Sequence, residues 1–145
     1  MPYILDSGVF ISLAREHRPG LREHLKTLGK LVTIKEVCTE CRNVLPVRIL
    51  SDLGVHIEPT QKPGGDYEQL TLLDSFQAGV GDITRADRAL IGHAIARGLD
   101  VLTTDARMRS NSYREFLRRL DRLKDARLPL WHIPHIEVLR VYRSH

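Results

Sequence analysis

The stretch Ala86–Asp105, ADRALIGHAIARGLDVLTTD, indicates the fold more clearly than any other part of the chain. Its first half carries apolar residues at helical spacing, including Leu90 and Ala94, and predicts a helix from about residue 84. Gly98 follows, at the place where a helix C-terminus favours a left-handed residue. The compact apolar run within residues 100–103 then predicts a short buried strand. A helix, a glycine and a buried strand in this order are typical of an α/β protein.

The first residues of the chain repeat the second half of this pattern. Tyr3-Ile4-Leu5 predicts a strand that ends at Asp6, just as the strand over residues 100–103 is followed by Asp105. In open α/β sheets, ligands bind beyond the carboxyl ends of parallel strands. Two strands that each deliver a carboxylate to that edge predict a metal site there.

The remaining elements alternate in the same way. We expect further strands at 31–33, 55–57 and 130–133, and helices at 8–16, 34–50, 66–78 and 111–124. The first helix is expected to continue in pieces to residue 28, and the second to be interrupted or bent near Pro46. Residues 136–142 are ambiguous between strand and helix. The pattern predicts one α/β domain over residues 1–145, with a parallel central sheet flanked by helices on both faces.

The composition places the chain among ordinary globular proteins. Its 145 residues are 42% hydrophobic and 28% charged, which is enough for a substantial core. No apolar run is long enough to cross a membrane, and the N-terminus lacks the pattern of a signal peptide. Only two cysteines are present, so a disulfide-stapled scaffold is not expected. We therefore expect a cytoplasmic protein with no membrane association.

The formal net charge of +4 is distributed unevenly. Basic residues gather between residues 107 and 127, where they outnumber the acids. Such a surface attracts the phosphate backbone of nucleic acids. The alternative is a solvated, arginine-rich helix face with no ligand.

Four acidic residues stand out by position: Asp6, Glu40, Asp87 and Asp105. Hard divalent cations such as Mg²⁺ prefer oxygen ligands, and crowded carboxylates repel one another unless a cation lies between them. The matching chemistry is phosphodiester hydrolysis, in which the metal polarises the phosphoryl oxygen and activates a water molecule.

Each acid also has a structural interpretation. Asp6 and Asp105 could cap the segments that follow them, and Asp87 could be a first-turn acid of a helix capped by Thr84. Glu40 could be any exposed helical glutamate, with Glu36 one turn earlier as its competitor for the site. Two strand-end aspartates and two acids on intervening helices together nevertheless favour a shared site.

Four blocks of the sequence resemble a PIN domain, the nuclease fold shared by VapC-type toxins and several RNA-processing ribonucleases. They are YILDSGVFI, LVTIKEVCTEC, ADRALIGHAIARG and DVLTTD, and the resemblance covers about residues 1–110. Beyond it we expect only a basic helix and a closing strand within residues 111–145. The resemblance implies a PIN-like fold and an endoribonuclease that requires Mg²⁺ or Mn²⁺ and leaves a 5′-phosphate and a 3′-hydroxyl.

The resemblance also implies roles for individual residues. Asp6, Glu40, Asp87 and Asp105 would be catalytic and metal-binding. Supporting roles would fall to Ser7, Thr103 and Thr104, with Glu36 and Asp82 as possible alternates, and the flanking arginines expected to hold the RNA backbone are Arg85, Arg88, Arg107 and Arg109.

Two departures from the family pattern bear on the site. The family commonly places a small polar pair after the first aspartate, but here the second member is Gly8. Asp82 adds an acid in a Gly-Asp turn shortly before Asp87. Neither departure removes a carboxylate, so we expect an active site.

The resemblance further implies partners, and the sequence leaves an alternative function open. The substrate would be RNA, a small antitoxin could cover the site with a basic side chain among the carboxylates, and a homodimer is expected. The alternative is a nucleic-acid or protein binding module that keeps the fold without cutting. Cys38-x-x-Cys41 favours ordinary helix packing over a zinc site, because no second ligand pair accompanies it.

Overall fold

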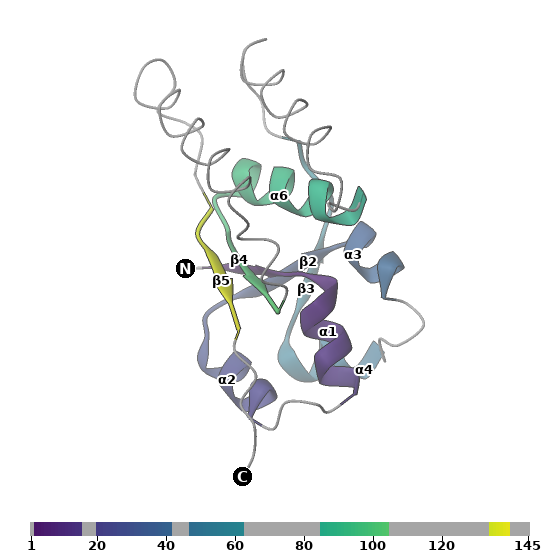
Figure 1. Ribbon diagram of the computed structural model, residues 1–145, viewed down its shortest axis with the longest axis vertical. Helices are drawn as coiled ribbons and strands as arrows, with labels where there is room; N and C mark the ends of the chain where they lie inside the picture. The colour runs from purple at the N-terminus through teal and green to yellow at the C-terminus, as the bar shows by residue number, and fades with distance from the viewer. Residues whose placement is uncertain (1, 16–19, 42–46, 63–84, 105–133, 140–145) are drawn as a thin grey trace.

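The computed structural model describes residues 2–15, 20–41, 47–62, 85–104 and 134–139 (Figure 1). Its centre is a sheet of five parallel strands in the order β3-β2-β1-β4-β5. The strands are β1 (Tyr3–Leu5), β2 (Leu31–Ile34), β3 (His56–Glu58), β4 (Asp100–Thr103) and β5 (Ile136–Val138). The predicted α/β class with a parallel sheet is confirmed.

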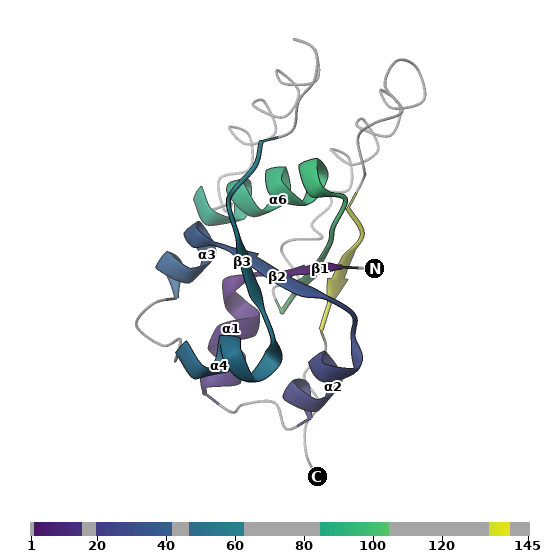
Figure 2. The ribbon, with the colours of Figure 1, turned by 180° about the vertical axis from the view of Figure 1, so that it is seen from behind.

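Helices flank the sheet on both sides. They are α1 (Ser7–Ala14), α2 (Leu21–Thr27), α3 (Lys35–Glu40), α4 (Val47–Leu53) and α6 (Arg85–Arg97). Helix α6 lies on one side of the sheet, and α1, α2 and α4 lie on the other (Figures 1 and 2). Helix α3 follows β2 directly and contacts both α1 and α6. These contacts bring α3 and α6 together beside the carboxyl end of the sheet.

The core follows from the apolar runs in the central strands. Ile4 and Leu5 of β1 are fully buried, and all four residues of β2 are buried. Strands covered on both faces favour continuous apolar runs instead of alternation, which is why these short segments could be recognised as strands. Phe10 of α1 and Leu90 of α6 are also fully buried in this core.

The deciding stretch of the sequence folds as predicted. Leu90, Ala94 and Ile95 are buried along α6. The helix ends at Arg97, and Gly98 adopts a left-handed conformation with a φ of 70°. Only glycine takes this conformation without steric cost, so the chain can turn directly into β4.

Several predicted elements differ from the structure or lie outside its described residues. The segment 34–50 contains α3 and the start of α4 as separate helices, in agreement with the predicted interruption near Pro46, and the strand predicted at 55–57 is found at 56–58. The ambiguous segment 136–142 contributes β5. The helices predicted at 66–78 and 111–124 and the strand predicted at 130–133 lie outside the described residues. None of the described helices has the length and apolar character needed to cross a membrane.

Candidate functional site

The sheet order places a topological switch point between β1 and β4. From β1 the chain adds β2 and β3 on one side of the sheet, and it later adds β4 and β5 on the other. Ligands of open α/β sheets bind at the carboxyl ends of the strands where the order reverses in this way. Asp6 follows β1 at that point, and Thr103 is the last residue of β4. The sequence therefore positions a carboxylate and a hydroxyl at the switch point.

Asp6 is fixed by the two elements that meet there. Its backbone amide donates a hydrogen bond to the Leu102 carbonyl at 3.2 Å, which links the end of β1 to β4. Its carboxylate accepts hydrogen bonds from the Val9 amide at 3.3 Å and from the Thr103 hydroxyl. Asp6 is therefore the N-cap of α1, one of the structural interpretations of the sequence, but it is only 4% exposed. Such burial exceeds what capping requires.

The surroundings of Asp6 disfavour its negative charge. Burial raises the pKa of Asp6 to about 6, and the hydrogen bond from Thr103 opposes this rise. The negative charge of Asp87 raises the pKa further, whereas the backbone amides of Val9 and Gly8 lower it. Asp87 lies in the first turn of α6, so α6 brings a second acid to the β1 end. Two neighbouring carboxyl groups, one of them buried, favour a bound proton or cation.

Glu40 approaches from a third element. The Ser7 hydroxyl, next to Asp6 in the chain, donates a hydrogen bond of 2.5 Å to Glu40 Oε1. The charges of Glu40 and Asp6 also contribute to raising the pKa of the Cys41 thiol to about 11, although burial is the largest cause. The last residue of α3 thus shares the surroundings of Asp6.

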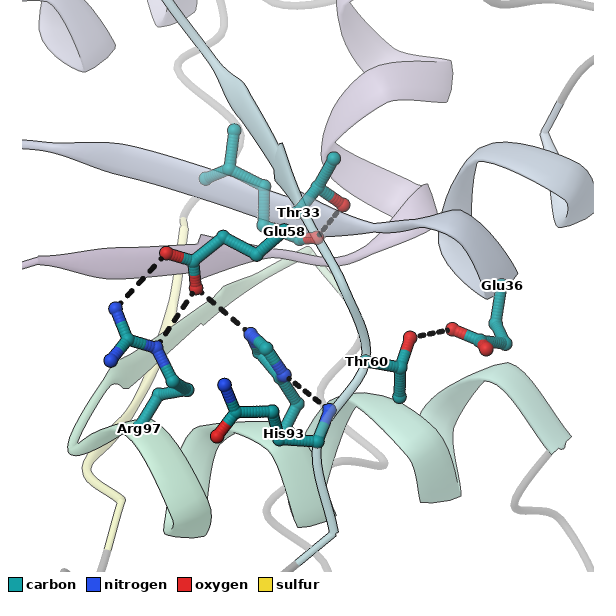
Figure 3. A network of polar contacts seen from close by, with 8 residues as sticks. Thr33, Glu36, Glu58, Thr60, His93 and Arg97 are labelled. Carbon is teal, nitrogen blue, oxygen red and sulfur yellow. Dashed lines mark hydrogen bonds and ion pairs between the residues drawn. The ribbon is translucent and has the colours of Figure 1, made fainter.

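Glu36 is held elsewhere, although it lies on the same helix. The Thr60 hydroxyl donates a hydrogen bond of 2.5 Å to Glu36 Oε2, and this bond is the main cause that lowers the pKa of Glu36 (Figure 3). Thr60 follows β3 in the chain. Of the two competing glutamates, the described contacts therefore connect Glu40, and not Glu36, to the residue beside Asp6.

The cysteines behave as packing residues. Both are free thiols, and the buried Cys41 donates a hydrogen bond of 3.1 Å to the Val37 carbonyl. Burial raises the pKa of both thiols. A raised pKa keeps a thiol protonated and inert, in agreement with the packing role that the sequence favours.

A polar network that the sequence analysis did not identify joins α6 to the segment after β3 (Figure 3). His93 is fully buried and accepts a hydrogen bond at Nδ1 from the Gln61 amide at 3.0 Å. Its Nε2 therefore carries the proton and donates to Glu58 Oε1 at 2.9 Å. Arg97, one turn further along α6, pairs with the other oxygen of Glu58 at 3.2 Å. The sequence does contain a signal for this network, because His93 lies within the apolar face of a predicted helix. A buried polar side chain there needs hydrogen-bond partners.

A hollow of about 410 Å³ lies beside the acidic residues. The described residues that line it come from α3 and from the start of α6: Lys35, Glu36, Thr39, Glu40 and Ala86. The space therefore borders both Glu36 and Glu40 and lies between the two helices that carry the candidate acids.

Other predicted site residues lie beyond what the structure describes. Asp82, Asp105, Arg107 and Arg109 fall outside the described residues, and of Arg85 only the backbone is described. Arg88 is half-buried, and its Nε has no hydrogen-bond partner in the described part of the chain.

The donor chemistry fits a hard divalent cation, but the described residues do not complete a site for one. Carboxylate oxygens, one of them on a buried group whose charge is disfavoured, are the ligands that Mg²⁺ and Mn²⁺ prefer. Within the described ranges, however, no three acidic, histidine or cysteine side chains are grouped closely enough to hold a metal. A complete site would need a further ligand, and the sequence offers Asp105 directly after Thr104.

Comparison with known proteins identifies the fold. The sequence matches no protein-family model and no curated protein. Among solved structures, the chain is similar to a chain of VapBC2 from Rickettsia felis, which was crystallised bound to a DNA fragment from the VapBC2 promoter. The TM-score is 0.50 and the sequence identity 16%, and the match covers 75% of this chain and 92% of the Rickettsia felis chain. A PilT N-terminus domain protein from the hyperthermophilic archaeon Sulfolobus solfataricus is similar with a TM-score of 0.52 and 12% identity, over 100% and 99% of the two chains.

These likenesses define the class of protein. The chain has the fold of a PIN domain, in agreement with the resemblance seen in the sequence. At such low identities the likeness concerns the fold, and the chemistry of the site has to be argued from its own residues.

Proposed function

We propose that this protein is a divalent-metal-dependent endoribonuclease that hydrolyses RNA phosphodiester bonds. The observation that carries the proposal is the buried Asp6 carboxylate at the switch point of a PIN-like sheet, with Asp87 close enough to raise its pKa. Such a pair is unfavourable in the absence of a cation and favourable in its presence. Metal-dependent hydrolysis of RNA, the reaction of nucleases with this fold, matches this arrangement of carboxylates.

In this proposal each element of the site has a distinct task. Asp6 and Asp105 would hold Mg²⁺ or Mn²⁺, with Asp87 and Glu40 completing the set. The ion would polarise the phosphoryl oxygen of the RNA and lower the pKa of the attacking water.

The chain itself orients these groups. The Thr103 hydroxyl fixes one oxygen of Asp6, and the Ser7 hydroxyl fixes one oxygen of Glu40. The carboxylates of Glu40 and Asp87 would accept hydrogen bonds from the attacking water and align it with the phosphorus, leaving a 5′-phosphate and a 3′-hydroxyl. The RNA backbone on either side of the cut would be bound by arginines that flank the acids in the sequence, namely Arg85, Arg88, Arg107 and Arg109.

We further propose that a small antitoxin protein covers this site in the cell, as the likeness to a VapBC chain suggests. A basic side chain placed among the carboxylates would offset their charge in place of the metal. A homodimer and a cytoplasmic location belong to the same proposal.

The test is cleavage of a labelled single-stranded RNA pool with Mn²⁺ and with EDTA, using the wild type and Asp6→Asn. We expect cleavage that requires the metal and is lost in the variant. The matched control is Asp52→Asn, the same chemical change at an exposed acid of α4 that makes only a long ion pair, of 3.9 Å, with Arg22 among the described residues. Undiminished cleavage by Asp6→Asn, or cleavage in EDTA, would overturn the assignment.

A second matched pair tests the choice between the two glutamates of α3. Glu40→Gln should lower the cleavage rate at least about 100-fold, as expected for a group that orients the attacking water. Glu36→Gln makes the same change at a residue bonded to Thr60 and should retain most of the activity. The reverse ranking would move the site towards Glu36.

The alternative function is a binding module that keeps the fold without cutting RNA. Gly8 favours it, because the family's second polar residue after the first aspartate is absent. Tight RNA binding without cleavage across several divalent metals would support this alternative.

A further inference from the structure

Gly8 lies in the first turn of α1, and the space beside it is already occupied. A Cβ atom added at Gly8 would lie 2.5 Å from Thr104 Oγ1 and 3.2 Å from Asp6 Oδ1. The first distance is far shorter than real carbon–oxygen contacts, so a side chain at position 8 would displace the Thr104 hydroxyl. The Thr104 Cβ would lie at 3.8 Å, which is an ordinary van der Waals contact. The severe conflict is therefore with the hydroxyl, and the contact with Asp6 Oδ1 is tight but needs a smaller shift.

The backbone brings these residues together. Leu5 is in register with Leu102, and the Asp6 amide bonds the Leu102 carbonyl, so the residues after β1 and those after Leu102 emerge side by side. Thr103 is buried and donates to Asp6 Oδ2. The next residue, Thr104, is half-buried, and its hydroxyl borders the same small space as Asp6 Oδ1. Thr103 thus bonds one oxygen of the carboxylate, and the Thr104 hydroxyl lies at the small space that the other oxygen borders.

We propose that Thr104 is a positioning residue of the Asp6 site, and that position 8 is glycine because the Thr104 hydroxyl takes the place where any larger side chain would begin. Glycine is otherwise an unfavourable residue within a helix. The close approach of Thr104 explains why glycine stands at position 8. The hydroxyl that α1 lacks at position 8 is supplied from the end of β4. This role rests on the proposed function, because the Thr104 hydroxyl would orient the metal ion and its ligands beside Asp6 Oδ1.

The packing half of the proposal is tested in EDTA, without metal or RNA. Alanine in place of an internal helix glycine ordinarily stabilises a protein. We expect the opposite for Gly8→Ala, with a melting temperature lowered by roughly 3–6 °C, because the added methyl overpacks against Thr104. Adding Thr104→Ala should reverse this loss, bringing the double variant to the melting temperature of Thr104→Ala alone or above it. A Gly8→Ala protein as stable as the wild type would overturn this half.

The positioning half is tested by Mn²⁺ titration of the same proteins. Thr104→Ala should weaken Mn²⁺ binding on the order of tenfold, as loss of a group that orients metal ligands does, and Thr104→Ser should retain it. The decisive comparison is Gly8→Ser/Thr104→Ala against Gly8→Ala/Thr104→Ala, which differ by one hydroxyl. The serine variant should regain most of the lost affinity. Equal affinities in these two proteins, or wild-type affinity in Thr104→Ala, would overturn the positioning role.

Failure of the proposed function has a different signature. A wild-type protein that binds no Mn²⁺ would refute the metal site and, with it, the positioning role of Thr104. The melting temperatures of Gly8→Ala and its double variant would still decide whether Gly8 and Thr104 are matched in packing.

Discussion

At the scale of single residues, Asp6 combines two roles that conflict in the absence of a ligand. It caps α1 and accepts the Thr103 hydroxyl, but it does so while buried and next to Asp87. Because its pKa is raised from 3.8 to about 6 in the folded state, the folded protein binds a proton more tightly than the unfolded chain does. The metal-free protein therefore loses stability as the pH rises from about 4 to 6, and the full cost remains above pH 6.

Asp6→Asn removes this cost while retaining an oxygen that can cap α1. In EDTA at pH 7.5, we expect the free energy of unfolding of the variant to exceed that of the wild type by up to about 3 kcal/mol, the equivalent of a pKa rise from 3.8 to about 6. The difference should shrink as the pH falls and approach zero only near pH 3, where the wild-type carboxyl is largely protonated in both states. Urea denaturation at the two pH values measures it. A variant less stable than the wild type at pH 7.5 would show that the Asp6 charge is well stabilised without metal.

At the scale of elements, the placement of Asp87 depends on how α6 is fastened to the rest of the molecule. His93 joins the middle of α6 to Glu58 and to the Gln61 amide, and neither of its ring nitrogens faces water (Figure 3). His93→Leu should cost about 1–3 kcal/mol, because it leaves the Gln61 amide without its acceptor and removes the buried one of the two side chains that pair with Glu58. Arg97→Ala, at the half-exposed end of the same network, should cost less than about 1 kcal/mol.

Urea denaturation of the two variants tests this ranking, and His93→Gln, which keeps polar atoms in place, should fall between them. Equal losses for His93→Leu and Arg97→Ala would mean that the buried hydrogen bonds contribute no more than the exposed ion pair.

The elements differ in how well the sequence predicted them. Strands β1, β2 and β4 were identified almost to the residue, because central strands of a parallel sheet are continuous apolar runs. Helix α6 and its stop at Gly98 were equally clear from periodicity and the glycine. The break between α3 and α4 was placed only approximately, since helical spacing continues across residues 34–50 and only Pro46 signals an interruption.

The position of Asp6 could be predicted because chain order and strand direction fix where the end of β1 emerges, whereas Asp105 lies outside the described residues. The hydroxyl partners of the acids were assigned by resemblance, and their geometry depends on side-chain packing between distant segments, such as Ser7 with Glu40 or Thr60 with Glu36. The fit of Thr104 against Gly8 was not predicted for the same reason. In the sequence Gly8 looked like a missing polar group, whereas in the fold it leaves room for one.

At the scale of the whole molecule, the distribution of charge favours a polyanionic substrate. The net charge is +4 although acids such as Asp6 and Asp87 lie at the candidate site, so the rest of the chain is more basic than the total indicates. RNA binding by the inactive Asp6→Asn protein should weaken steeply with salt, because each phosphate contact releases counterions. Measured by fluorescence anisotropy, the affinity for RNA should fall at least about tenfold between about 50 and 200 mM salt if three or more phosphates are contacted. Affinity that does not change over this range would exclude a phosphate-dominated interface.

In the proposed function, the acids at the end of the parallel sheet hold one divalent cation that cleavage requires. Titration of the metal-free protein with Mn²⁺, followed by electron paramagnetic resonance of the free ion, tests this claim without requiring the right RNA. We predict saturable binding to the wild type and to Asp52→Asn, and binding at least about tenfold weaker in Asp6→Asn and Asp87→Asn. Unchanged Mn²⁺ binding in both of these variants, or none in the wild type, would contradict the account.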